Sequence, residues 1–166
     1  FPLQRMTTLE ELEAYPWPSP DWYDYSQLPR LAAQYPGRAV MCGYTAPFYF
    51  HNQLRGLEQS FMDPLVYPDM TRFIVQRLSD FFFEYHRRCF EAAPGLIDVA
   101  QVTDDWGSQY GLLVAPRLFH QFYRAATQRA IDQAKSYGII VFHHDDGDMR
   151  PLLPALVDMG IEILNP

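Results

Sequence analysis

Short apolar runs alternate along this chain with longer segments in which apolar residues recur every three or four positions. The clearest periodic segment spans residues 69–92, where the apolar side chains form one wide face of a helix. Four short runs are mainly apolar, as buried strands are, and they lie at 39–44, 96–102, 139–142 and 161–164. Further helices are expected at 47–56, at 149–159 and from 116 to the turn at Gly138. From residue 39 onward the pattern predicts strand, helix, strand, helix, strand, helix, strand.

Single helices between uniformly apolar strands predict parallel pairing with right-handed crossovers. No glycine-rich phosphate-binding turn follows any of these strands, which disfavours a dinucleotide-binding open sheet. A complete (β/α)8 barrel has eight strands and typically about 250 residues. We therefore expect an α/β fold that is a partial (β/α)8 TIM barrel. It would have about four parallel strands with connecting helices, in a chain truncated at both ends.

The region before the first strand has a different character. Thr8 and Glu11 form a capping box that opens a short helix, and the prolines between Pro16 and Pro20 end it. A second short helix is expected at 28–35. We therefore expect residues 1–38 to be a helical lead-in segment and residues 39–166 to be the partial barrel domain.

Composition and charge narrow the class of protein. The 166 residues are 48% hydrophobic and 20% charged, as in a folded domain. The formal net charge of −7 argues against nucleic acid as a partner, because phosphate binding needs a basic surface. No apolar run reaches the roughly 18 residues that span a bilayer, and we expect no signal peptide. Two cysteines without a pattern are expected to be reduced, so we expect a cytoplasmic protein without a membrane partner.

Polar residues gather directly after the predicted strands. The carboxyl ends of barrel strands form one rim, where catalytic groups collect. We expect four catalytic residues at this rim: Asp104, Asp105, His144 and Asp146. Five further residues are expected to contact the substrate: Tyr44, Arg55, Trp106, His143 and Asn165.

The run from His143 to Asp148 admits two interpretations. In an extended chain His144 and Asp146 point to the same side, and so do His143 and Asp145. An imidazole and a carboxylate on one side can chelate a metal ion, or act as a general base with its orienting partner. Asp104 or Asp105 would supply a third ligand. The alternative is a solvated turn in which Asp148 caps the next helix.

The same residues carry a family resemblance. The segment 103–109, Thr-Asp-Asp-Trp-Gly-Ser-Gln, followed by Gly111-Leu112-Leu113, resembles the uroporphyrinogen decarboxylase superfamily, which includes cobalamin-dependent methyltransferases. Leu54-Arg55-Gly56 and the stretch from Gly147 to Pro154 are similar to it as well. The resemblance runs from about Val40 to the last residue. It implies a (β/α)8 barrel enzyme, either a methyltransferase or a carboxy-lyase, of which this chain is roughly the middle half.

The resemblance is better to the methyltransferases around residues 104–113, and the arginine-rich segment of the decarboxylases is absent from this sequence. The zinc motif of the methyltransferases is histidine, then cysteine two places on, then glycine. Here the motif reads His144-Asp145-Asp146-Gly147, so a carboxylate replaces the thiolate and gives a harder ligand set.

Our leading hypothesis is a corrinoid-methyltransferase-like enzyme with a divalent metal, zinc being one candidate, held by His144 and Asp146. Its ligand would be a small molecule or a tetrapyrrole-like ring, with cobalamin as the substrate or carried on a corrinoid protein. The alternatives are a uroporphyrinogen decarboxylase of porphyrin biosynthesis and a catalytically inactive barrel that serves as a binding module. Because half of the rim would lie outside this piece, the remainder of its own barrel is an expected partner.

Overall fold

Four parallel strands form the central sheet of the computed structural model, which describes residues 1–165. They are β1 (Met41–Thr45), β2 (Val99–Val102), β5 (Ile140–His144) and β6 (Ile163–Asn165), hydrogen-bonded in the order β1-β2-β5-β6. Spatial order follows chain order, so every crossover moves one strand further in the same direction. A barrel is wound in this way, whereas a doubly wound sheet reverses. The predicted partial TIM barrel is confirmed.

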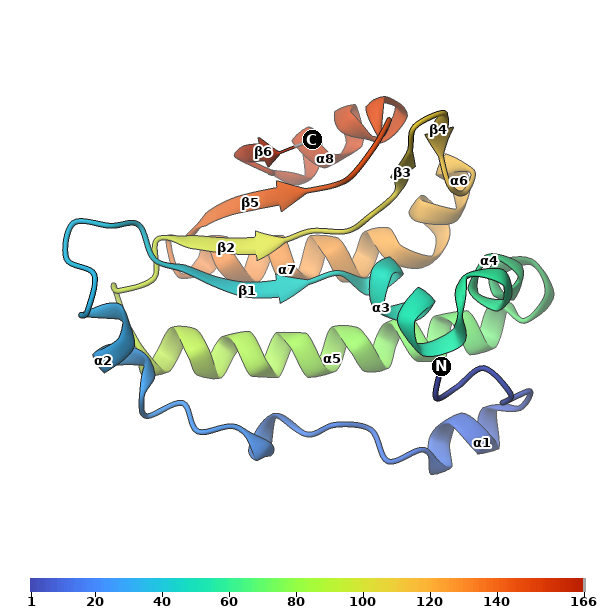
Figure 1. Ribbon diagram of the computed structural model, residues 1–166, viewed down its shortest axis with the longest axis horizontal. Coiled ribbons are helices and arrows are strands. Elements are labelled where there is room, and N and C mark those ends of the chain that lie inside the picture. The colour runs from blue at the N-terminus through green and yellow to red at the C-terminus, as the bar shows by residue number, and fades with distance from the viewer. Residues whose placement is uncertain (166) are drawn as a thin grey trace.

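Two long helices cover one face of the sheet, as Figure 1 shows. Helix α5 (Pro68–Ala92) joins β1 to β2 and packs against α7 (Arg124–Ser136), which leads into β5. Helix α5 begins at Pro68, one residue before the predicted start, because proline suits the first helical position. Helix α8 (Leu153–Met159) precedes β6 and ends at Gly160 in a left-handed conformation. Among the helices of residues 1–165, none has the length and apolar character needed to cross a bilayer.

The N-terminal segment runs beside α5 (Figure 1). It contains α1 (Leu9–Ala14), a 3-10 turn at Pro20–Trp22 and α2 (Leu28–Ala32). The capping box is present: the Glu11 N–H donates to Thr8 Oγ1 at 3.2 Å, and the Glu11 carboxylate accepts from the Thr8 N–H. Leu3 and Leu12 are fully buried in an apolar cluster with four residues of α5: Met70, Ile74, Leu78 and Phe82. Apolar burial therefore attaches this segment to the face of α5 opposite α7.

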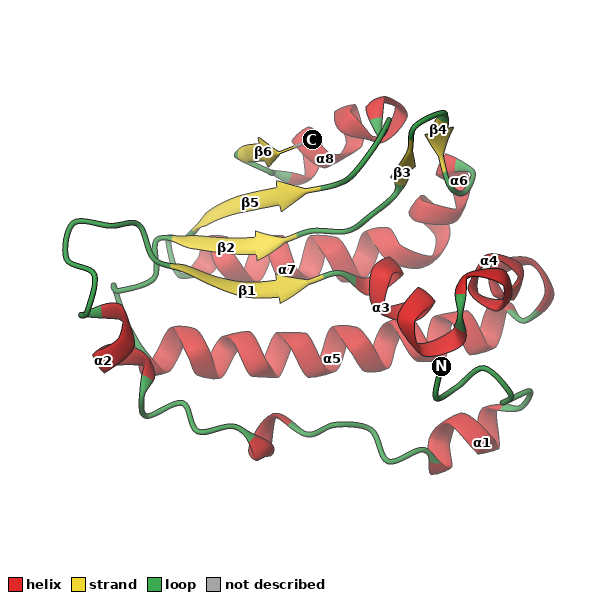
Figure 2. Cartoon of the chain, in the orientation of Figure 1, coloured by secondary structure: helices red, strands yellow, loops and turns green. Residues whose placement is uncertain are grey.

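Several short elements shape the ends of the strands, as Figure 2 shows. Helix α3 (Pro47–Arg55) follows β1 as predicted, and α4 (Leu57–Val66) was not predicted. A small antiparallel hairpin of β3 (Gly107–Ser108) and β4 (Gly111–Leu112) occupies a stretch for which no strand was predicted. Helix α6 (Pro116–Leu118) and a π-helical turn at Phe119–Tyr123 lead into α7, and a 3-10 turn at Arg150–Leu152 leads into α8.

A buried histidine joins α5 to β1. Nε2 of His86 lies 3.3 Å from the Tyr44 backbone nitrogen and accepts its N–H, and Nδ1 lies 3.2 Å from Thr45 Oγ1. Burial lowers the pKa of His86 to about 4, because the ring has no room for solvent around its charged form. In the folded chain the ring therefore stays neutral at a pH at which it is protonated in the unfolded chain.

This difference makes stability depend on pH. The contribution of neutral His86 is present above its unfolded pKa of 6.5 and is lost as the pH falls toward 4. Between pH 7 and pH 5 the expected loss is about 2 kcal/mol. Denaturant unfolding at both pH values should show this loss in the wild type and a correspondingly smaller loss in His86→Gln. Equal pH dependence in the two proteins would contradict the assignment.

Candidate functional site

Three side chains converge where β2 and β5 end. Asp105, His144 and Asp146 each offer one ligand atom, and these atoms all lie within 4.8 Å of one another. Nε2 of His144 is 3.4 Å from Asp146 Oδ1. Asp105 and His144 are partly buried, whereas the Asp146 side chain is 78% exposed. Strands β2 and β5 are parallel neighbours, so their carboxyl ends meet at one edge and bring these residues together.

The orientation of His144 is set by Asn165, at the end of β6. Nδ1 of His144 lies 2.8 Å from Asn165 Oδ1. An amide oxygen can only accept, so Nδ1 carries the proton and the lone pair is on Nε2. The lone pair therefore lies on the nitrogen nearest Asp146. A metal-binding histidine is commonly held in this way by a partner on its other nitrogen.

The electrostatics of the cluster are those of crowded negative charge. Partial burial raises the pKa of Asp105, and the charges of Asp146 and Asp145 raise it further. The pKa of Tyr44, at the end of β1, is raised by burial and then by the charge of Asp105. Like charges held close together favour the binding of a proton or a cation. Tyr44 thus lies within the electrostatic reach of the cluster.

Asp104 lies outside this cluster. Its carboxylate is buried and accepts the N–H groups of Phe48 at 3.1 Å and Tyr49 at 2.7 Å, in the first turn of α3. Burial raises the pKa of Asp104 well above its ordinary value, and the two N–H donors oppose that rise. The residue before this turn is Ala46, whose side chain cannot cap the helix. Asp104 supplies the cap from the neighbouring strand, so only one of the two predicted aspartates joins the cluster.

His143 and Asp145 lie beneath the cluster and are buried. Nδ1 of His143 is 2.7 Å from the Val102 carbonyl oxygen, and its Nε2 is 3.4 Å from Asp145 Oδ2. The other oxygen of Asp145 accepts the N–H groups of Trp106 and Gly107. The predicted alternation is therefore present. The side chains of His143 and Asp145 are buried, and those of His144 and Asp146 lie on the more exposed side. His143 was expected to contact the substrate, but its inward position removes it from the cluster.

Two further residues expected at the substrate are buried in the interior. Trp106 is 1% exposed and stacks on Phe48 with a centroid separation of 4.1 Å. Arg55 is 1% exposed, and its Nε and Nη2 donate to the Asp63 carboxylate at 2.6 and 2.9 Å. Its remaining nitrogen donates to backbone carbonyls of the N-terminal segment. In this structure Trp106 packs in the core and Arg55 forms a buried ion pair with Asp63.

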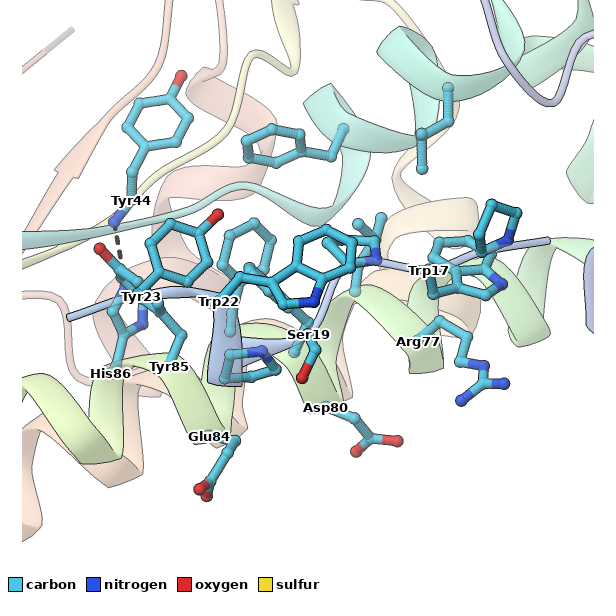
Figure 3. A pocket seen from close by; sticks show the side chains of 18 of the residues that line it. Trp17, Ser19, Trp22, Tyr23, Tyr44, Arg77, Asp80, Glu84, Tyr85 and His86 are labelled. Atoms are coloured by element: carbon cyan, nitrogen blue, oxygen red, sulfur yellow. Dashed lines mark hydrogen bonds between the residues drawn. The ribbon is translucent and has the colours of Figure 1, made fainter. Parts of the chain in front are cut away.

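A cavity of about 1110 Å³ lies elsewhere, between the N-terminal segment, β1 and α5. Figure 3 shows aromatic side chains of both segments around it, among them Trp17, Trp22 and Tyr85. None of the three clustered side chains lines this cavity. Tyr44 is near both places: its N–H donates to His86 on the cavity side, while its ring points away (Figure 3). The cavity therefore does not define the candidate site.

Comparisons with known proteins agree with this fold. The family model for uroporphyrinogen decarboxylase (URO-D) matches residues 5–166. A comparison with curated protein sequences gives no match. Among solved structures, a methyltransferase from Methanosarcina mazei is similar, with a TM-score of 0.64 and 23% identity over 82% of this chain and 39% of that chain. The chain thus spans about two fifths of that neighbour's length. From the match over nearly its whole length, the chain belongs to the uroporphyrinogen decarboxylase family.

Proposed function

We propose that the chain forms part of a metal-dependent, corrinoid-methyltransferase-like enzyme. Its divalent cation would be bound by Asp105, His144 and Asp146 at the carboxyl ends of β2 and β5. The observation that carries this proposal is the convergence of three ligand atoms within 4.8 Å, with the lone pair of His144 on Nε2. The sequence left the third ligand open between Asp104 and Asp105. We propose Asp105, because the Asp104 carboxylate already accepts the N–H groups of Phe48 and Tyr49.

The donor set suits a borderline divalent ion. Imidazole binds zinc and its neighbours in the first transition row, and carboxylates extend the range toward manganese. A bound cation would supply Lewis acidity and a fixed point for a substrate heteroatom. Asn165 holds the His144 ring in place. We propose that Tyr44 contacts the substrate through its hydroxyl group. In the absence of a thiolate ligand, activation of a substrate thiol would be weaker than at a cysteine-containing site.

Methyl transfer is supported by family membership, together with a structural neighbour that is named a methyltransferase. At 23% identity that likeness establishes the fold alone, so the reaction is part of our proposal. The methyl carrier we propose is a corrinoid, either free or on a partner protein. The remainder of the barrel would complete the rim around these residues.

Tetrapyrrole decarboxylation is the second candidate, and the crowding of carboxylates at Asp105 favours it. Because its pKa is raised, Asp105 can exchange a proton, and the negatively charged carboxylate of Asp146 lies beside it. In a reaction without a metal these groups would stabilise a protonated pyrrole. The two candidates differ in their requirement for a cation and can therefore be separated experimentally.

The cation site can be tested by titrating the chain with Co²⁺ and following the visible absorption of the bound ion. His144→Ala and Asp105→Ala should each lower the Co²⁺ affinity at least about tenfold, since each removes a ligand. Two exposed residues provide matched controls: His120→Ala and Asp158→Ala make the same chemical changes away from the site and should leave the affinity unchanged. A wild-type chain that binds neither Co²⁺ nor Zn²⁺ would end the proposal.

Asp104 and Asp105, adjacent in sequence, should respond in opposite ways to substitution. Asp104→Ala removes the cap of α3 and leaves one buried and one partly buried N–H group without an acceptor, which should lower the free energy of unfolding by about 2 kcal/mol. Asp105→Ala should leave stability nearly unchanged and reduce cation binding. Denaturant unfolding and Co²⁺ titration of both variants check this contrast. A stability loss in Asp105→Ala equal to that in Asp104→Ala would count against it.

The proposed methyl transfer is tested by an activity assay on the natural protein. With methylcobalamin and a thiol acceptor, we expect loss of the methylcobalamin absorbance, and we expect His144→Ala to abolish it. Turnover of uroporphyrinogen, unaffected by a chelator, would instead support the decarboxylase candidate. A protein that shows neither activity but still binds methylcobalamin or uroporphyrinogen would be identified as a binding module.

A further inference from the structure

Asp105 lies between two buried neighbours. Asp104 is fixed to the first turn of α3, and Trp106 is buried and stacks on Phe48. The direction of the Asp105 side chain is therefore determined by the main chain on either side of it. On the Asp104 side this main chain is held by α3 and by β5, because the Asp104 N–H donates to the His144 carbonyl at 3.2 Å. On the other side it needs a separate support.

Asp145 provides that support. Its side chain is fully buried, and its Oδ1 accepts the Trp106 N–H at 2.8 Å and the Gly107 N–H at 3.1 Å. These two donors are the first main-chain N–H groups after Asp105. The carboxylate comes from the segment between two of the proposed ligands, His144 and Asp146. One buried group thus joins both halves of the cluster.

We propose that Asp145 is a positioning residue for the cation site. By binding the main chain of Trp106 and Gly107, it holds Asp105 beside His144 and Asp146. This inference rests on the proposed cation-binding function. It assigns Asp145 no contact with the cation or with a substrate, since its side chain is on the inner side of the strand end.

The second oxygen of Asp145 allows position and charge to be separated. Oδ2 lies 3.4 Å from Nε2 of His143, and neither atom has a hydrogen-bond partner among the described residues. Because Nδ1 of His143 donates to the Val102 carbonyl, a neutral ring presents the lone pair of Nε2 toward Asp145. An asparagine at 145 keeps one acceptor for the two N–H groups, and its NH2 group can donate to that lone pair. It therefore preserves position while it removes charge.

The test compares Asp145→Asn with Asp145→Ala by Co²⁺ titration of the full chain. If position matters, Asp145→Asn should bind Co²⁺ within about threefold of wild type, and Asp145→Ala about tenfold or more weakly. The Co²⁺ absorption spectrum of Asp145→Ala should resemble that of Asp105→Ala, because the Asp105 carboxylate is displaced from the cation in the first variant and removed in the second. Equal losses in Asp145→Asn and Asp145→Ala would show an effect of charge alone and would overturn the proposal.

A double-mutant cycle excludes general destabilisation. If Asp145 acts through Asp105, Asp145→Ala should change the Co²⁺ affinity by less than about twofold when Asp105 is already alanine. A loss of the same size in both backgrounds would overturn the proposal. If Asp145→Ala does not fold, Asp145→Ser takes its place, since a hydroxyl close to the main chain does not reach both N–H groups.

Hydrogen exchange gives a reading that needs no metal. The Trp106 and Gly107 amide protons should exchange at least about tenfold faster in Asp145→Ala than in wild type, and at nearly the wild-type rate in Asp145→Asn. A wild-type chain without cation affinity would refute the proposed cation site, while these rates would still decide whether Asp145 holds the segment. Unchanged exchange in Asp145→Ala would refute the positioning role by itself.

Discussion

The segments that follow β2 and β5 touch main chain to main chain, and the candidate site depends on that contact. A side chain at Gly107 would overlap the carbonyl oxygen of Asp146, and a Cβ at Gly147 would lie 2.6 Å from the Ser108 nitrogen. Gly147 also has a φ of +82°, which other residues rarely adopt. The Asp148 N–H then donates to the Ser108 carbonyl at 2.8 Å. Because the two segments are joined in this way, the outward side chains they carry keep a fixed relation.

Each of these segments sends one polar side chain inward and the next outward. The inward groups of Asp104, His143 and Asp145 bind the main chain, as burial of polar groups requires. The sequence predicted the alternation from the period of an extended chain, but not which member of each pair faces inward. In the run from Asp104 to Asp105 both residues are polar, so no apolar neighbour marks the buried side. That choice is made by the first turn of α3, 55 residues away from Asp104 along the chain.

The four strands and α5 could be predicted because their patterns are long or uniformly apolar. The β3–β4 hairpin could not, since two strands of two residues show no period. Helix α4 was missed because Gly56 directly before it and Pro64 within it both read as helix breakers. The ion pair of Arg55 was missed for another reason. Its partner Asp63, eight residues away, lies on the unpredicted helix α4. The guanidinium also binds the carbonyls of Leu3 and Met6, and contacts across about fifty residues leave no local pattern.

With a carboxylate at position 146, the cluster combines two carboxylates with one imidazole. Asp105 and Asp146 lie close to each other and to His144, and burial together with the charge of Asp146 raises the pKa of Asp105. Either a proton or a divalent cation relieves this repulsion, so the two compete for the same place. When a cation is bound, the cluster is the Lewis-acid site proposed for methyl transfer. When a proton is bound instead, the same residues form the acid–carboxylate pair that the decarboxylase candidate requires. Both candidate functions therefore follow from one electrostatic feature, and the relative affinity for protons and cations decides between them.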